Sequence, residues 1–425
     1  MSIIVNIQSY EILDSRGTPT LFTEVELSNG VKGAAAVPSG ASTGKHEALE
    51  LRDGDSKRFN GKGVLKNIDI IHSIIFDALS GMDVRKQRKI DQLLLKLDGT
   101  NNKKKLGANT LLSVSLATAK AAANYEQKEL YRYLGGVNSY QLPIPLVNII
   151  NGGAHANNNL DIQEYMLTPI GAKTFKEAIR WCSEIFHNLK DILKNKNYST
   201  SVGDEGGFAS NFKNNEEPIE YLIKAIKASK LSPEKEVMIS LDVAATEFFK
   251  NKKYKISAKK KPLSNISMSE YLIKLCKKFP IFSIEDGMSE DDWTGWSYMS
   301  KNLADKTLII GDDLFVTNKK RLLKGIKRKA ANSILIKLNQ IGTLTETFDT
   351  INVAKRHNYK TVISHRSGET EDSFISDLAI GTNAMFIKSG SVTRSERCAK
   401  YNRLILLEEI DKNLVYSGLE LNEKI

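Results

Sequence analysis

The stretch VMISLD, residues 237–242, is a short apolar run that ends in an acidic residue, and the same pattern returns five times before the chain ends. A charged or titratable residue closes each run, in the order Asp242, Glu285, Asp312, Lys337, His365 and Lys388. Successive members are separated by 23 to 43 residues. Since a β-strand with its crossover helix needs about 30 residues, the spacing predicts repeated β-α units with each polar residue at the carboxyl end of a strand.

Such a series of units is typical of a closed (β/α) barrel of the eight-stranded type. Strand carboxyl ends converge there on one face, and active sites lie on that face. We therefore predict that the six polar residues share one pocket. The alternative is that each residue simply ends its strand at the solvent, which is adequate for one residue and much weaker for all six.

The N-terminal third is organised differently. Residues 3–13, 20–27 and 31–39 alternate apolar and polar positions between Gly- and Pro-containing turns, which predicts three strands. Residues 64–79 and 108–127 carry apolar residues at helical spacing. This order predicts an α+β cap, a three-stranded antiparallel meander plus helices, over residues 1–138, with the barrel over residues 139–425.

Length and composition agree with a two-domain globular protein. The chain has 425 residues, of which 41% are hydrophobic and 26% charged. No apolar stretch approaches the ~20 residues that span a bilayer, and residues 1–11 lack the pattern of a signal peptide. We therefore expect a cytoplasmic protein. Its three cysteines are far apart, which favours neither a disulfide framework nor a zinc site.

The net charge of +11 comes partly from seven lysines between residues 250 and 261. Such a run could contact nucleic acid or an anionic membrane surface. Aromatic residues for base stacking are nearly absent there, so a solvated, lysine-rich hairpin inserted between two barrel units is the favoured interpretation.

The acidic members of the series point to a metal. Asp242, Glu285 and Asp312 could share a small volume in ionised form only if a cation neutralised them. Oxygen ligands without His or Cys select Mg²⁺ or a similar ion. Lys337 and Lys388 follow on later strands, and a lysine beside a bound metal has a lowered pKa that makes it available as a base.

Seven longer motifs resemble those of the enolase family. They are PSGASTGKHEALELRDGD (38–55), NIINGGAHANNNLDIQEYM (148–166), GDEGGF (203–208), SIEDG (283–287), GDDLFVTN (311–318), IKLNQIGTLTET (336–347) and SHRSGETED (364–372). The resemblance runs in order from DSRG at 14–17 to RSERCAKYN at 394–402. Seven motifs in order are far more specific than any one of them.

The resemblance implies an enolase-type barrel and the reversible dehydration of 2-phosphoglycerate to phosphoenolpyruvate, a glycolytic and gluconeogenic step. It implies two Mg²⁺ ions per site, one conformational and one catalytic. The first would be held by Asp242, Glu285 and Asp312, and the second would be reached by Ser42.

The same resemblance implies roles for the remaining site residues. Lys337 would be the base at carbon 2, and Glu205 the general acid for the carbon 3 hydroxyl, assisted by Glu164. The implied substrate contacts are Arg366 and Ser367 to phosphate, Lys388 to carboxylate, His155 to phosphate or hydroxyl, and Gln163 in support of Glu164. His365 would line the pocket without a proton-transfer role. The family also implies homodimers, in some members octamers of dimers, and admits a second presence at the cell surface or outside the cell.

Three residues depart from the usual family pattern. They are Thr18 in place of Asn, Ser210 in place of Pro and Ser389 in place of Thr. We expect them to affect local stability rather than chemistry, with Thr18 altering a turn and Ser210 loosening the loop after Glu205.

Two rival interpretations remain open from the sequence. A different enzyme of the same superfamily would share the three metal carboxylates but would not need GDEGG, SGASTG and SHRSG together. A non-catalytic scaffold or adhesion protein would tolerate the loss of site residues, whereas every expected polar group is present.

Overall fold

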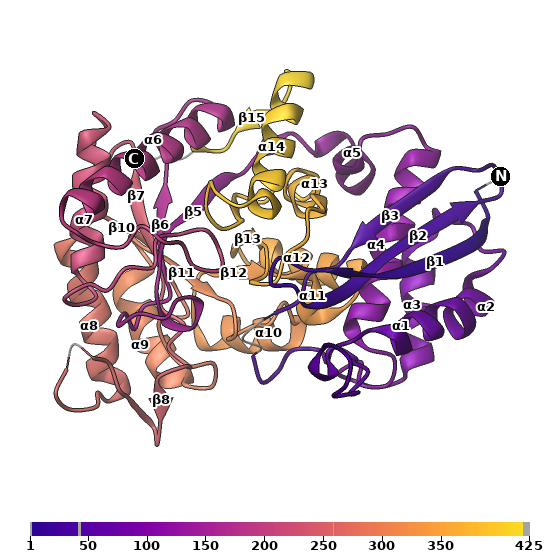
Figure 1. Cartoon of the computed structure of the whole chain (residues 1–425), viewed down its shortest axis with the longest axis horizontal. Helices are drawn as coiled ribbons and strands as arrows, with labels where there is room; N and C mark the ends of the chain where they lie inside the picture. The colour runs from indigo at the N-terminus through magenta and orange to yellow at the C-terminus, as the bar shows by residue number, and fades with distance from the viewer. Residues whose placement is uncertain (1, 41–43, 258, 420–425) are drawn as a thin grey trace.

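The computed structural model describes residues 2–40, 44–257 and 259–419. The chain forms a three-stranded sheet covered by helices, which lies beside a closed barrel (Figure 1). Ser42, one of the predicted metal ligands, lies outside the described residues.

The N-terminal sheet is the predicted antiparallel meander. Its strands are β1 (Ile4–Leu13), β2 (Pro19–Leu27) and β3 (Lys32–Ala36), paired in the order β1-β2-β3. The helices that follow are α1 (Leu65–Ile70), a π-helical turn (Ile71–Ile75), α2 (Phe76–Leu79), α3 (Gln87–Asp98), α4 (Ala108–Tyr125) and α5 (Leu130–Gly135). The single helix predicted over residues 64–79 is therefore interrupted by the π-helical turn.

Helix α4 packs against strands β2 and β3 of this sheet. Its alanine-rich sequence is buried along nearly its whole length, and small side chains allow the helix to approach β3 closely. At Gly33 a Cβ atom would lie 2.0 Å from the backbone nitrogen of Ala121. This position therefore requires glycine.

The barrel closes in the strand order β10-β11-β12-β13-β14-β5-β6-β7. Its strands are β5 (Ile144–Asn151), β6 (Glu164–Thr168), β7 (Met238–Asp242), β10 (Ile281–Glu285), β11 (Leu308–Gly311), β12 (Ser333–Ile336), β13 (Lys360–Ser364) and β14 (Phe386–Lys388). All eight residues of β5 are buried, as expected for a strand enclosed between the barrel interior and a layer of helices.

The regular spacing does not extend to β6, which runs antiparallel to both β5 and β7. Residues 152–163 between β5 and β6 contain only a short 3-10 helix, Gly153–His155. Without a crossover helix the chain cannot return to start a parallel strand, so it comes back antiparallel. Glu164, the first residue of β6, consequently lies at the same end of the barrel as the last residues of its neighbours.

Helices follow most barrel strands and surround the barrel (Figure 1). They are α6 (Phe175–Asn195), α7 (Glu217–Ala228), α8 (Asn265–Lys278), α9 (Trp293–Leu303), α10 (Lys319–Arg328), α11 (Leu338–Ile341), α12 (Leu344–Arg356), α13 (Phe374–Gly381) and α14 (Ser395–Ile410). The short strands β4 (Gln141–Leu142) and β15 (Val415–Tyr416) pair with each other outside the barrel.

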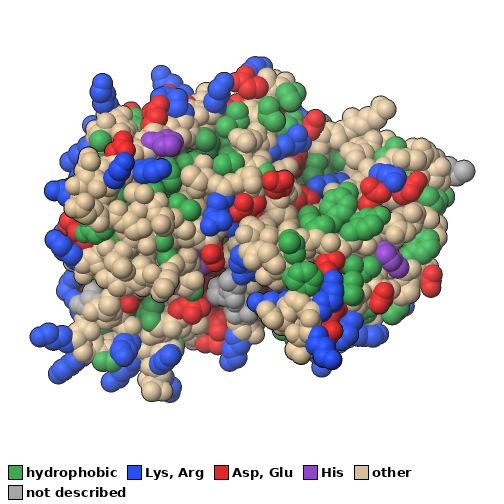
Figure 2. Space-filling view, in the orientation of Figure 1, with side chains coloured by type: hydrophobic (Ala, Val, Ile, Leu, Met, Phe, Trp, Pro, Cys, Tyr) green, Lys and Arg blue, Asp and Glu red, His purple; other side chains and the backbone are tan. Residues whose placement is uncertain are grey.

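The lysine-rich segment forms the predicted hairpin. Strands β8 (Phe249–Lys250) and β9 (Lys253–Tyr254) pair antiparallel, and the Tyr254 hydroxyl donates to the Asp292 carboxylate at 2.7 Å. All seven lysines of this segment are exposed. Blue side chains project from the lower left of the molecule in Figure 2, where Figure 1 draws β8. The insertion accounts for the longest interval in the strand series.

The departures from the family pattern are accommodated locally. The turn at Thr18 is held by Asp14, whose carboxylate accepts from the backbone N–H groups of Arg16 and Thr18 at 2.8 and 2.9 Å. Ser210 is buried and its hydroxyl donates to the Ser199 carbonyl, so this serine ties the loop rather than loosening it. Ser389 is buried, and nothing in the described structure bonds its hydroxyl.

The three cysteines, all within the described residues, are free thiols. Among the helices of the described chain, none combines the length and apolarity needed to cross a membrane.

Candidate active site

A cavity opens at the end of the barrel where the predicted polar residues lie. Five of the six residues in the strand series line it, namely Asp242, Asp312, Lys337, His365 and Lys388. The sixth, Glu285, is not a lining residue, but its carboxyl group contacts the Lys388 ammonium at 2.9 Å. The other lining residues with polar side chains are His155, Gln163, Glu164, Glu205, Glu247, Asp286, Asp313, Ser364, Arg366 and Ser367.

Strand pairing explains why three carboxylates share one layer. Glu164 pairs with Asp242 across β6 and β7, and Asp242 pairs with Glu285 across β7 and β10. The Lys388 ammonium lies among them, 3.2 Å from Glu164, 3.0 Å from Asp242 and 2.9 Å from Glu285. Burial disfavours the charged amine, but these three carboxylates outweigh it and raise the pKa of Lys388 well above its usual value.

On the neighbouring wall Lys337 pairs with Asp312. The Nζ atom of Lys337 lies 2.5 Å from Oδ2 of Asp312, while Gln340 donates to Oδ1 at 2.8 Å. Burial again opposes the charge, but Asp312 raises the pKa of Lys337. In this arrangement Lys337 is a protonated partner of a carboxylate rather than a free base.

Two carboxylates that the sequence analysis did not select lie beside Asp312. Asp286 accepts from the backbone N–H groups of Asp312 and Asp313 at 2.9 and 2.8 Å. Ligand oxygens of Asp286, Asp312 and Asp313 lie within 4.8 Å of one another. Two adjacent acidic residues in SIED and again in GDD were the available signal in the sequence. Only the first acid of each pair was selected from the sequence.

The described side chains fit a bound cation. Seven carboxyl groups line the cavity against the three basic side chains of Lys337, Arg366 and Lys388. Burial, and secondly the charge of Asp242, raises the pKa of Glu285 well above its usual value. The buried Oε1 atom of Gln163 and Oε2 atom of Glu164 have no hydrogen-bond partner within the described chain. Oxygen-rich surroundings with excess negative charge suit Mg²⁺.

Gln163 itself contacts a different residue from the one expected. Its Nε2 atom donates to Oδ2 of Asp242 at 3.3 Å, so it supports a predicted metal ligand rather than Glu164.

The opposite side of the cavity gathers two glutamates and two histidines. Nδ1 of His155 lies 3.5 Å from both Glu164 and Glu205, and Nε2 of His365 lies 3.4 Å from Glu205. Burial, followed by the charge of Glu205, raises the pKa of Glu164 to about 8. Burial lowers the pKa of both histidines. This side therefore combines a carboxyl group that keeps its proton near neutral pH with neutral imidazoles.

Arg397, which the sequence analysis also missed, fixes the orientation of His365. Its fully buried guanidinium contacts Nδ1 of His365 at 2.5 Å and donates to the carbonyls of Arg366 and Ser367 at 2.6 and 2.7 Å. Since a guanidinium can only donate, Nδ1 of His365 must accept. The ring proton of neutral His365 therefore lies on Nε2, which faces Glu205.

The predicted phosphate contacts lie where the N-terminal segment reaches the barrel. Nη1 of Arg366 contacts Glu47 at 3.0 Å and Asn339 at 3.2 Å. At Gly40 a Cβ atom would lie 1.8 Å from Nη2 of Arg366, so glycine allows the backbone to pass beside the guanidinium. Ser367, the next residue, is buried at the same end of the barrel.

Together these features define a barrel enzyme with an acid-lined site at strand carboxyl ends and an α+β cap. Two family models match the chain, "Enolase, N-terminal domain" over residues 4–134 and "Enolase, C-terminal TIM barrel domain" over residues 139–425. The chain belongs to the enolase family. It is accordingly an enolase-type lyase, of the hydro-lyase class.

Proposed function

We propose that this chain catalyses the reversible, Mg²⁺-dependent dehydration of 2-phosphoglycerate to phosphoenolpyruvate. The observation that carries the proposal is the opposition of an amine and a carboxyl pair across one cavity. Lys337 follows β12 and Glu164 begins β6, and three strands separate β12 from β6 in either direction around the closed barrel. A substrate between them could lose a proton on one face and a hydroxyl on the other.

Lys337 is the proposed base at carbon 2. It can accept a proton only when Asp312 no longer stabilises its ammonium form, and Asp312 is one of the residues that we propose hold Mg²⁺ instead. The substrate carboxylate would lie against Lys388, whose charge is maintained by the surrounding carboxylates.

Glu205 is the proposed acid for the departing hydroxyl. Glu164 and His155 lie beside it, and the pKa of about 8 at Glu164 means that this carboxyl group holds a proton at neutral pH. Asn148 donates to Oε2 of Glu205 at 3.1 Å and His365 faces Oε1, so both oxygens are held in place. Arg366 and Ser367 are the proposed phosphate contacts, because an Arg fork matches phosphate oxygens.

The proposed ligands of the first Mg²⁺ are Asp242, Glu285 and Asp312, and Ser42 is the proposed ligand of a second. Bound Mg²⁺ would supply positive charge next to the substrate carboxylate, which offsets the negative charge that develops when the carbon 2 proton is removed.

Family membership also supports oligomerisation. We propose a homodimer, alone or in an octamer of dimers, acting in the cytoplasm on small-molecule substrates.

A spectrophotometric assay of phosphoenolpyruvate formation from 2-phosphoglycerate tests the proposal. Activity should disappear when a chelator removes divalent metal and return when Mg²⁺ is added in excess. Full turnover by metal-free protein would overturn the proposal, because the excess of carboxylates over cations in the cavity could not stabilise an additional negative charge.

A further inference from the structure

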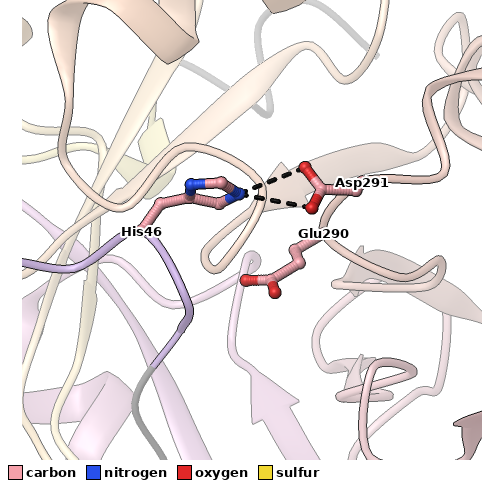
Figure 3. Close-up of side chains that lie close together, drawn as sticks. All are labelled: His46, Glu290 and Asp291. Atoms are coloured by element: carbon pink, nitrogen blue, oxygen red, sulfur yellow. Dashed lines mark hydrogen bonds and ion pairs between the residues drawn. The ribbon is translucent and has the colours of Figure 1, made fainter.

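A second group of potential metal ligands lies outside the catalytic cavity. His46 belongs to the N-terminal segment, whereas Glu290 and Asp291 belong to the loop between β10 and α9. One ligand atom from each of the three lies within 4.8 Å of the other two. Figure 3 shows the imidazole of His46 facing the Asp291 carboxylate, with the Glu290 carboxylate drawn below the space between them. None of the three lines the catalytic cavity.

The His46 and Asp291 side chains are spaced as two ligands of one tetrahedral ion would be. Nε2 of His46 lies 3.2 and 3.3 Å from the two carboxylate oxygens of Asp291. Two ligands that are each ~2.1 Å from a tetrahedral zinc ion lie about 3.4 Å apart. The pair could therefore accept an ion with little movement.

Glu290 is an independent observation that points to a cation. It is only 7% exposed, and its Oε2 atom accepts from the backbone N–H of Lys45 at 3.1 Å. No ion pair involves its carboxylate in the part of the chain that the structure describes. Its backbone is held by Arg321, which donates to the Glu290 carbonyl at 2.7 Å. A buried carboxylate in a fixed position without a permanent cation is an unusual arrangement.

Two neighbouring cations compete for the Asp291 carboxylate. Arg321 lies 3.4 Å from Oδ1 of Asp291, and the exposed Lys45 ammonium lies 3.9 Å from Oδ2. Neither cation forms an ion pair with the Glu290 carboxylate in the described structure. The simplest alternative is thus an ordinary ion pair between His46 and Asp291, with Glu290 left as a buried acid.

We propose that His46, Glu290 and Asp291 form a binding site for a divalent transition metal ion of the zinc type, separate from the Mg²⁺ sites. An imidazole nitrogen with two carboxylates suits Zn²⁺ or Co²⁺ and not Mg²⁺, which prefers oxygen ligands alone. Three protein ligands leave a fourth position for water.

Such an ion would join the N-terminal segment to the barrel. His46 is followed by Glu47, whose carboxylate accepts from Arg366 at 3.0 Å and from Gln340 at 3.3 Å. An ion at His46 would hold this segment against the barrel and stabilise the folded state by mass action.

Calorimetric titration of Zn²⁺ into the full chain, with millimolar Mg²⁺ present to occupy the catalytic sites, tests the proposal. Wild type should bind Zn²⁺ in one component. The affinity of that component should be at least ~10-fold weaker in both His46→Ala and Glu290→Gln, since even residues outside the ligand shell contribute that much to metal affinity. His357→Ala, which removes an exposed histidine elsewhere, should bind as wild type does.

Thermal unfolding of the same proteins provides a second measurement and a check on folding. Zn²⁺ should raise the unfolding temperature of wild type and His357→Ala more than that of His46→Ala and Glu290→Gln. The proposal is overturned if His46→Ala, folded by circular dichroism, binds Zn²⁺ as tightly as wild type. It is also overturned if only His46→Ala weakens binding and Glu290→Gln does not, because Glu290 would then not be a ligand.

Discussion

The two sides of the catalytic cavity are built in different ways. On one side, Asp242, Glu285, Asp312, Lys337 and Lys388 come from the ends of parallel strands that follow the regular β-α spacing. On the other side, Glu164 starts the antiparallel strand β6, while His155 and Glu205 come from connecting segments. The parallel side holds ammonium groups among carboxylates, whereas the β6 side holds a protonated carboxyl group and neutral histidines.

The difference separates two physical tasks. The parallel side balances charge and depends on having as many cations as its carboxylates require. The β6 side controls protons and depends on burial, which keeps Glu164 protonated and the histidines neutral. Substitutions on the two sides should therefore have different effects on the protein.

Lys388→Ala should have the largest effect on stability. It leaves the buried Asp242 carboxylate, and the carboxyl groups of Glu285 and Glu164 beside it, without the cation that they share, and breaking such a buried arrangement costs about 3–5 kcal/mol. Urea unfolding of metal-free protein measures this loss. Added Mg²⁺ should reduce it, because a bound cation would replace part of the lost charge.

The hairpin lysine Lys252 provides the matched control, since it is exposed. Lys252→Ala should unfold like wild type with or without Mg²⁺. A loss at Lys388→Ala that Mg²⁺ leaves unchanged would show that the parallel side does not bind the ion.

Glu164→Gln should change how stability depends on pH. Burial raises the pKa of Glu164 from 4.5 to about 8, so between these values the folded chain keeps a proton that the unfolded chain has lost. The free energy of unfolding of metal-free wild type should therefore fall as pH rises through this window, by up to about 1.4 kcal/mol per unit. The Gln variant cannot titrate there.

Urea unfolding at several pH values gives the test as the difference between wild type and Glu164→Gln. The free energy of unfolding of wild type, relative to that of Glu164→Gln, should fall steadily from about pH 4.5 to about pH 8 and then stay constant. A difference that stays constant with pH would mean that Glu164 is ionised in the folded chain.

Arg397→Lys should have a smaller effect, confined to the β6 side. One ammonium cannot replace the fork that contacts Nδ1 of His365 and the carbonyls of Arg366 and Ser367. A buried group left unsatisfied costs about 1–3 kcal/mol of stability. Histidine ¹⁵N NMR should find His365 protonated on Nε2 in wild type and a mixture of tautomers in the variant. An unchanged tautomer in the variant would remove Arg397 from this role.

The sequence predicted the parallel side better than the β6 side for a physical reason. A strand that ends at a charged residue and recurs every β-α unit leaves a periodic signal, which identified the five residues of the parallel side and also His365. The antiparallel return of β6 leaves no such signal, because it depends on the absence of a helix in residues 152–163. Glu164, His155 and Glu205 were therefore selected only through the resemblance.

Other features could not be read from local patterns at all. The contact of Arg397 with His365 joins residues 32 positions apart in the chain, and it depends on how α14 lies against the segment that follows β13. The hydrogen bonds of Asp286 to the backbone of Asp312 and Asp313 likewise appear only when β10 and β11 are aligned. Such contacts are set by tertiary packing rather than by spacing.

The measurement that most directly tests the division between the two sides is exchange of the carbon 2 proton of 2-phosphoglycerate with heavy water, followed by NMR on folded, Mg²⁺-loaded variants. Lys337→Ala should lose both turnover and exchange, while Glu205→Gln should lose turnover and retain exchange, with each loss at least the ~10²-fold typical of a general acid or base. Exchange at the wild-type rate in Lys337→Ala would contradict the assignment of the base, and normal turnover in Glu205→Gln would move the acid elsewhere, with Glu164 the first candidate.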